Sequence, residues 1–327
     1  MSAGTRPGAR FADMFGSFPT AERLAFDIRS FGSVEGYHDM FGARLSRILG
    51  VPRDVFAAVG QLSEVDYVKR AVELLEPHTR SAAELVADLT AQGVTATVLH
   101  NPLPTTPYLS NDSLAELVAP FPDRMIGFCR IRAEDPEAAA AEIRRCAALG
   151  LRGVTFTPFW HRMRANDPAL DPVYRACLDA DLPIWIHTSV FWERRTPLSF
   201  EHPLYLDEVA TRFPDLCIIA GHGGWPWIPE MVTVAWRQTN VYIDFSAFRP
   251  RHLATSGSGW DMLWYQLPRM LSHKVVFGST WQLLGLPVSD VLAELDGLGL
   301  DGRTLHRWRY ANLAGVLRLP EAPEEAP

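Results

Sequence analysis

Several side chains that can move a proton or hold an anion follow short apolar runs of this sequence. An imidazole titrates near neutral pH, so it can act as a general acid or a general base. A guanidinium can pair with a carboxylate or a developing oxyanion. These residue types therefore indicate acid/base chemistry on a small anionic molecule, and the candidates are Asp27, Arg29, His100, Arg130, His161, His187, His222, Asp244 and Thr280.

The apolar runs alternate with segments of helical period, which is typical of a parallel sheet with crossover helices. We expect an α/β fold of the TIM type, a (β/α)8 barrel with a helical insertion near the N-terminus. An open doubly wound sheet is the competing fold, but no G-x-G-x-x-G turn follows the first strand. The expected strands span 24–31, 94–100, 125–131, 153–157, 183–187, 216–220, 241–245 and 274–278, and the clearest helices span 81–91, 134–149, 171–180 and 204–212.

In such a barrel the functional residues stand at the C-terminal ends of the strands, where the candidates above also stand. The expected organisation is a flexible arm at 1–20, a single barrel domain at 21–319 and a flexible tail at 320–327. Residues 33–78 are too many for one ordinary connection, so we expect a helical lid over the barrel mouth there.

Composition excludes several classes of partner. The 31 Lys and Arg residues against 38 Asp and Glu residues leave a net charge of −7, without runs of like charge. This pattern disfavours nucleic acid and membrane surfaces and favours a small-molecule substrate. The four cysteines lie far apart and are expected to be reduced core thiols. No signal peptide or membrane span is evident, so we expect a cytoplasmic protein.

Four segments carry a resemblance to a known family. They are PIWIHTS at 183–189, RFPDLCIIAGHGGWPWIPEM at 212–231, TNVYIDFSAF at 239–248 and KVVFGST at 274–280. In these motifs the chain resembles the amidohydrolase-related superfamily, in the branch typified by aminocarboxymuconate-semialdehyde decarboxylase. The resemblance runs from about residue 80 to 319 and implies the barrel fold.

The resemblance also implies a divalent metal, but the motif positions that would hold it differ here. Relatives carry D-x-H-x-H on strand one, whereas residues 27–31 read DIRSF, and the strand-eight aspartate is replaced by Thr280. His187 and His222 match the histidines of strands five and six. Since a catalytic divalent site normally needs three or more protein ligands, we predict that no metal cofactor is bound.

The same comparison suggests roles for the remaining candidates. Arg29 is expected to take over part of the metal's electrostatic task by pairing with a substrate carboxylate or oxyanion, although it could instead pair with Asp27 or Asp244. His187 and His222 would act as acid and base, with Asp27 and Asp244 orienting them. Aromatic residues near the mouth favour a flat substrate. The expected substrate-binding residues are Arg29, Phe31, His100, Arg130, His161, Trp192, Trp225, Thr280 and Trp281.

The sequence thus predicts a metal-independent lyase that carries out decarboxylation, or a related C–C or C–O bond step, on a small unsaturated or aromatic carboxylic acid. Three alternatives stay open. One is a cyclase or isomerase of a specialised biosynthetic pathway. Another is a hydrolase that keeps zinc or another divalent metal through His100 or His161 together with His187. The third is an inactive ligand-binding pseudoenzyme. The resemblance also suggests a homodimer.

Overall fold

The computed structural model describes residues 11–16, 81–100, 110–191 and 196–320, together with five isolated positions at Ser63, Val65, Asp66, Lys69 and Glu73. Four of these five positions, all except Ser63, are helical. They lie within the insertion expected at 33–78, most of which falls outside the described residues. Within the described residues, none of the helices combines the length and the apolarity required to cross a bilayer.

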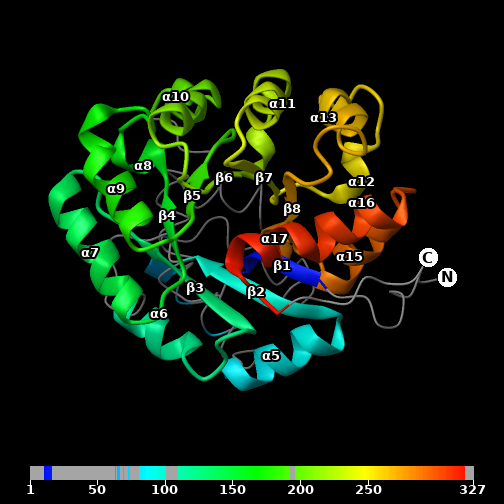
Figure 1. Cartoon of the computed structure of the whole chain (residues 1–327). Coiled ribbons are helices and arrows are strands. Elements are labelled where there is room, and N and C mark those ends of the chain that lie inside the picture. The colour runs from blue at the N-terminus through cyan, green and yellow to red at the C-terminus, as the bar shows by residue number, and fades with distance from the viewer. Residues whose placement is uncertain are drawn as a thin grey trace.

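Eight parallel strands form a single sheet in sequential order, and this confirms the predicted TIM barrel (Figure 1). Each strand pairs in parallel with the next one along the chain. The strands are β1 (Phe11–Gly16), β2 (Val94–His100), β3 (Met125–Arg130), β4 (Gly153–Phe156), β5 (Ile184–His187), β6 (Ile218–Gly221), β7 (Val241–Phe245) and β8 (Val275–Phe277).

Helices fill the connections and surround the sheet (Figure 1). Two of the longer ones start at side-chain caps: Ser81 and Glu84 form a capping box before α5, and Asp135 followed by Pro136 opens α7. The helices are α5 (Ala82–Ala91), α6 (Asn111–Val118), α7 (Pro136–Ala148), α8 (Pro158–His161), α9 (Asp171–Asp179), α10 (Leu204–Arg212), α11 (Ile228–Arg237), α12 (Pro250–Leu253), α13 (Asp261–Gln266), α14 (Trp281–Leu284), α15 (Val288–Asp296), α16 (Gly302–His306) and α17 (Asn312–Leu317).

The first strand lies elsewhere than the sequence predicted. β1 is Phe11–Gly16, inside the stretch 1–20 that was expected to be an arm, and it pairs with β2. The predicted strand at 24–31 lies outside the described residues, but it is not the first strand of this barrel. The segment FADMFG lacks β-branched residues and contains an aspartate and a glycine, so its local preference for a strand is weak. Tertiary contacts compensate, because Asp13 is buried and bonded to Ser279.

Two apolar clusters define the inside and the outside of the barrel. The interior cluster joins alternate residues of several strands, for example Met14 of β1, Phe128 of β3 and Trp185 of β5. The outer cluster joins the other strand face to the helices. Residues of α17 belong to the interior cluster, and the carbonyl of Leu317 accepts a hydrogen bond from Arg152, which immediately precedes β4. α17 therefore covers the N-terminal end of the barrel, opposite the end where the functional residues were expected.

Candidate active site

His187 ends β5 and is held by a buried carboxylate. Its Nδ1 lies 2.6 Å from Oε2 of Glu201, and Oε1 of Glu201 accepts the backbone N–H of Phe159 at 2.8 Å. Burial raises the pKa of Glu201, and the attraction of His187 opposes that rise. When Glu201 is ionised it can only accept, so the His187 proton stands on Nδ1 and the lone pair on Nε2. This arrangement leaves Nε2 as the reactive atom of the ring.

His222 follows β6 and is connected to a second buried carboxylate through a hydroxyl. The Ser246 hydroxyl donates to Oδ2 of Asp244 at 2.6 Å, and the Ser246 hydroxyl oxygen lies 2.7 Å from Nδ1 of His222. Because the hydroxyl proton is used toward Asp244, the Ser246 oxygen accepts from Nδ1–H of His222. Burial raises the pKa of Asp244 to about 7, despite hydrogen bonds from Ser246 and Trp185 that lower it. The chain Asp244, Ser246, His222 can therefore respond to protonation near neutral pH.

The two imidazoles lie side by side at the mouth of the barrel, on the ends of the neighbouring strands β5 and β6. Their ring centroids are 4.9 Å apart, and the rings are nearly perpendicular. The indole of Trp185 lies beside both, with centroids 6.0 Å from His187 and 5.2 Å from His222, and its Nε1 donates to Asp244 at 2.9 Å. Since Trp185 belongs to the interior cluster, it forms the floor of this polar group.

Aromatic rings also border the His187 side of the mouth. Phe159 meets the His187 ring edge-on at 5.1 Å and stacks on Phe191 at 4.2 Å with an interplanar angle of 3°. Apolar flat surfaces next to two titratable rings suit a planar organic molecule with a few polar handles.

A second group of polar residues comes from β2, β3 and β4. His100 ends β2, with Nδ1 2.9 Å from the Thr155 hydroxyl and Nε2 2.8 Å from the Met14 carbonyl. Because the Met14 carbonyl can only accept, Nε2 of His100 carries a proton. Its ring lies 4.9 Å from Trp185, so His100 adjoins the same floor. Arg130 ends β3, next to Thr155 in the strand register.

The turns after β6, β7 and β8 have unusual backbone conformations. His222, Ala247 and Thr280 have positive φ angles of 61°, 64° and 39°. Non-glycine residues in this region are strained, and such strain tends to occur at functional sites. The Thr280 hydroxyl accepts the N–H of Ala247 and so ties two of the turns together. Thr280, predicted to bind substrate, is thus engaged in holding the loop.

The structure brings five predicted site residues to the barrel mouth and leaves others apart from it. Those at the mouth are His100, Arg130, His187, His222 and Asp244. His161 stacks on Phe156 of the outer cluster and pairs with Glu134 at 2.9 Å. Trp225 packs on Phe248, and Trp281 packs against the outer cluster. Asp27, Arg29, Phe31 and Trp192 lie outside the described residues.

Sequence reasoning missed the partners that orient the two histidines. Glu201 comes from a short 3-10 turn, Leu198–Glu201, in the connection after β5, and no sequence pattern marks it. Ser246 follows Asp244 by two residues, so strand alternation places both on the inner face, a signal that could have been used. Trp185 likewise alternates with His187 on β5. Its hydrogen bond to Asp244, by contrast, depends on the closure of the barrel.

The donor set at the mouth does not fit the metal site of the resembled family. The inward side chains of β1 are Ala12 and Met14, and Gly16 has no side chain, so this strand offers no imidazole. After β8, the Ser279 hydroxyl is bonded to Asp13, and Thr280 holds Ala247. Across the described ranges, no three His, Cys, Asp or Glu side chains are grouped so that they could hold an ion.

Comparison with known proteins agrees with this barrel fold. The amidohydrolase family profile matches residues 63–295, which is more than half of the chain. The chain belongs to this amidohydrolase family. The resemblance read from the motifs is therefore confirmed.

Curated relatives lie in the decarboxylase branch of the family. A γ-resorcylate decarboxylase of Polaromonas is 29% identical over 148 residues, which cover 43% of this chain and 43% of that protein. A 2-amino-3-carboxymuconate-6-semialdehyde decarboxylase of Dictyostelium discoideum is 31% identical over 84 residues, which cover 25% of this chain and 23% of that protein. The chain thus matches less than half the length of each relative.

The fold is shared with a solved decarboxylase. The 5-carboxyvanillate decarboxylase of Novosphingobium aromaticivorans superposes with a TM-score of 0.62 at 19% identity, covering 95% of this chain and 97% of that one. That structure contains manganese and 4-hydroxy-3-methoxy-5-nitrobenzoic acid. At this level of identity the likeness concerns the fold alone, and its metal is a property of that protein.

Proposed function

We propose that the protein is a lyase that decarboxylates a small aromatic or unsaturated carboxylic acid by acid/base chemistry, without a metal. The observation that carries this proposal is the adjacent pair His187 and His222, each bonded at Nδ1 to an oxygen that orients the ring. The relatives named above are decarboxylases, which favours this reaction over cyclisation or hydrolysis.

In the proposed reaction, His222 as an imidazolium donates a proton from Nε2 to the carbon that bears the carboxylate. The electron pair of the C–C bond returns to the conjugated system as carbon dioxide leaves, so one proton replaces one CO2. Asp244, when ionised, stabilises the imidazolium through Ser246, an effect that is strong in a buried site. His187, oriented by Glu201, acts as a second acid/base group beside the substrate.

Metal independence is supported by the donor set, because the family positions on β1 and after β8 carry residues that supply no anionic or imidazole ligand. The four cysteines are free thiols, which suits the reducing cytoplasm that we propose as its location. The homodimer stays a prediction from the resemblance.

The test is decarboxylation of a panel of aromatic carboxylic acids, including γ-resorcylate and 5-carboxyvanillate, with CO2 release as the measurement. In D2O, the carbon that carried the carboxylate should acquire one deuterium. His222→Ala should abolish turnover. Ser246→Ala should slow it by about 10- to 100-fold, because the ring loses its orienting acceptor.

Ser272→Ala is the matched control. This serine is also buried, and it accepts a hydrogen bond from Arg307, but it precedes β8 and so stands at the opposite end of the barrel. Its turnover should equal that of the unmodified protein. Turnover that survives in His222→Ala, or a panel that releases no CO2 above the uncatalysed rate, contradicts the proposal.

A further inference from the structure

Arg130 extends from the last position of β3 into the mouth of the barrel. Alternate residues of a strand share one face, and Ile126 and Phe128 of β3 belong to the interior cluster. Arg130 therefore continues the inner face, beyond Phe128. Phe128 pairs with His100 in the strand register and its ring lies 5.3 Å from the His100 ring, so the end of β3 that carries Arg130 adjoins the His100 side of the mouth.

Within the described residues, no carboxylate forms an ion pair with this guanidinium, and Glu142 attracts it only from a distance. Nη1 of Arg130 is inaccessible to solvent and has no hydrogen-bond partner among the described residues. Burial, followed by the positive charge of Arg132, lowers the pKa of Arg130 to about 10. A partly buried cation whose inaccessible nitrogen has no hydrogen-bond partner is costly, which favours a site that receives an anion.

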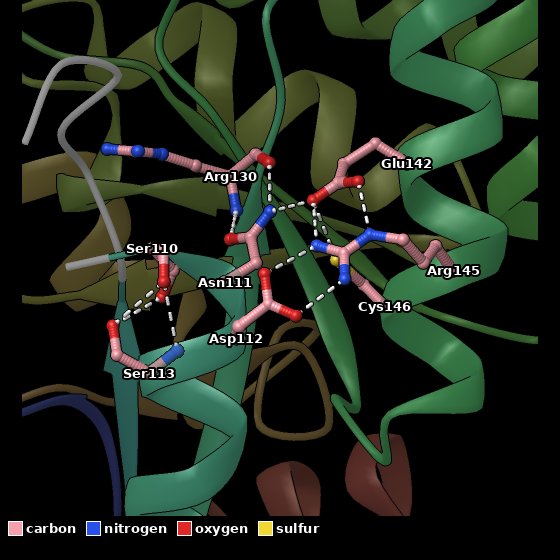
Figure 2. Close-up of polar contacts among 8 residues, drawn as sticks. All are labelled: Ser110, Asn111, Asp112, Ser113, Arg130, Glu142, Arg145 and Cys146. Carbon is pink, nitrogen blue, oxygen red and sulfur yellow. Dashed lines mark hydrogen bonds and ion pairs between the residues drawn. The ribbon is translucent and has the colours of Figure 1, made fainter. Parts of the chain in front are cut away.

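The backbone of Arg130 is fixed from behind by Asn111, the first residue of α6. Asn111 accepts the Arg130 N–H at Oδ1 and donates to the Arg130 carbonyl, both at 3.1 Å. It also donates to Glu142 at 2.7 Å, and Glu142 is held by Arg145. Figure 2 shows the Arg130 side chain directed away from this cluster. Glu142 therefore positions the strand end and attracts the Arg130 guanidinium from a distance, but it forms no ion pair with it.

We infer that Arg130 binds a second carboxylate of the substrate, one that the reaction leaves in place. This inference rests on the proposed decarboxylation. A strong ion pair with the departing carboxylate would stabilise the ground state and be lost as neutral CO2 forms, which slows the reaction. An ion pair with the carboxylate that stays on the substrate is kept in the transition state, so it does not slow the reaction, and it holds the substrate ring in place. The substrate class is accordingly a dicarboxylic aromatic acid.

The test compares three probes by isothermal titration calorimetry: isophthalate, 3-carbamoylbenzoate, in which a neutral amide replaces one carboxylate, and benzoate. The unmodified protein should bind isophthalate on the order of 10- to 100-fold more tightly than 3-carbamoylbenzoate. In Arg130→Gln the two affinities should become equal. Arg130→Lys should restore part of the difference, because it keeps the charge but not the planar fork.

Two further variants separate positioning from folding. Asn111→Ala should weaken isophthalate binding and leave 3-carbamoylbenzoate binding unchanged. Arg144 is an exposed arginine of α7, so Arg144→Gln should leave the affinities for isophthalate and 3-carbamoylbenzoate unchanged. The role of Arg130 is wrong, and the proposed function stands, in either of two outcomes. In one, Arg130→Gln still binds isophthalate more tightly than 3-carbamoylbenzoate. In the other, the unmodified protein binds benzoate but does not prefer isophthalate to 3-carbamoylbenzoate. If no probe binds the unmodified protein, both the role of Arg130 and the proposed function are wrong.

Discussion

Asp244 is fully buried, yet hydrogen bonds through Ser246 connect it to His222 at the barrel mouth. Its pKa rises from the ordinary aspartate value of 3.8 to about 7, chiefly through burial. The folded protein therefore holds a proton that the unfolded chain has already lost between these two pH values. The stabilisation from this proton is complete below about pH 4 and is lost as the pH rises through about 7.

We expect the free energy of unfolding of the unmodified protein to fall as the pH rises from 4 to 7, relative to Asp244→Asn. The amide imitates the protonated acid and does not titrate, so the difference should change by on the order of 2–4 kcal/mol across this range. Urea denaturation at several pH values measures it. Glu201 titrates in both proteins, so the comparison isolates Asp244. Parallel stability curves for the two proteins would show that Asp244 is not the titrating group.

At the scale of the elements, two glycines at strand ends make room for the polar group. A Cβ at Gly221, the last residue of β6, would lie 2.1 Å from the Trp185 ring. A Cβ at Gly278, just after β8, would lie 2.3 Å from Oδ1 of Asp244. Both positions face the interior, where Trp185 and Asp244 are hydrogen-bonded to each other. The absence of a side chain at these ends is thus a requirement of the site.

Gly221→Ala should destabilise the protein by about 1–3 kcal/mol, because Trp185 cannot move without breaking its bond to Asp244. Gly315→Ala in the exposed interior of α17 is the control, since nothing lies within 4 Å of its Cβ position. There alanine should stabilise the protein by about 0.5–1 kcal/mol. Chemical denaturation measures both. Equal, small effects at the two positions would show that the space at Gly221 is not required.

Most elements could be predicted because their patterns are local. The strands β2 and β7 match the predicted bounds, and the termini of the other strands after β1 differ by at most two residues. β1 could not be predicted, because what stabilises FADMFG is its pairing with β2 and the bonds of Asp13 to a residue 266 positions away. The role assigned to Arg29 depended on the wrong strand, so it loses that support.

The candidate site divides in the same way. His187 and His222 could be predicted because they stand within recognisable motifs at strand ends. Glu201 could not be predicted, because only the tertiary fold carries this turn back to His187. The unpartnered Nη1 of Arg130 could not be predicted either, since a sequence does not say which arginines form ion pairs.

At the scale of the whole molecule, the loss of ligands on two neighbouring strands of the barrel, β1 and β8, predicts a protein that needs no metal. Protein expressed with added manganese, zinc and iron should contain well under one equivalent of any of them by elemental analysis. A chelator should leave turnover and melting temperature unchanged. About one equivalent of metal, whose removal abolishes turnover, would contradict metal independence and leave the proposed acid/base residues to be tested separately.

The bond between Asp13 and Ser279 closes the seam between the first and last strands of the barrel. During synthesis, β1 leaves the ribosome long before its neighbour across the seam exists. At typical translation rates the 266 residues from position 14 to Ser279 take about 13–50 s to make. Throughout that interval the growing chain carries an open sheet edge, which can pair with other chains. Coexpressed chaperones that shield such edges should therefore raise the yield of this protein.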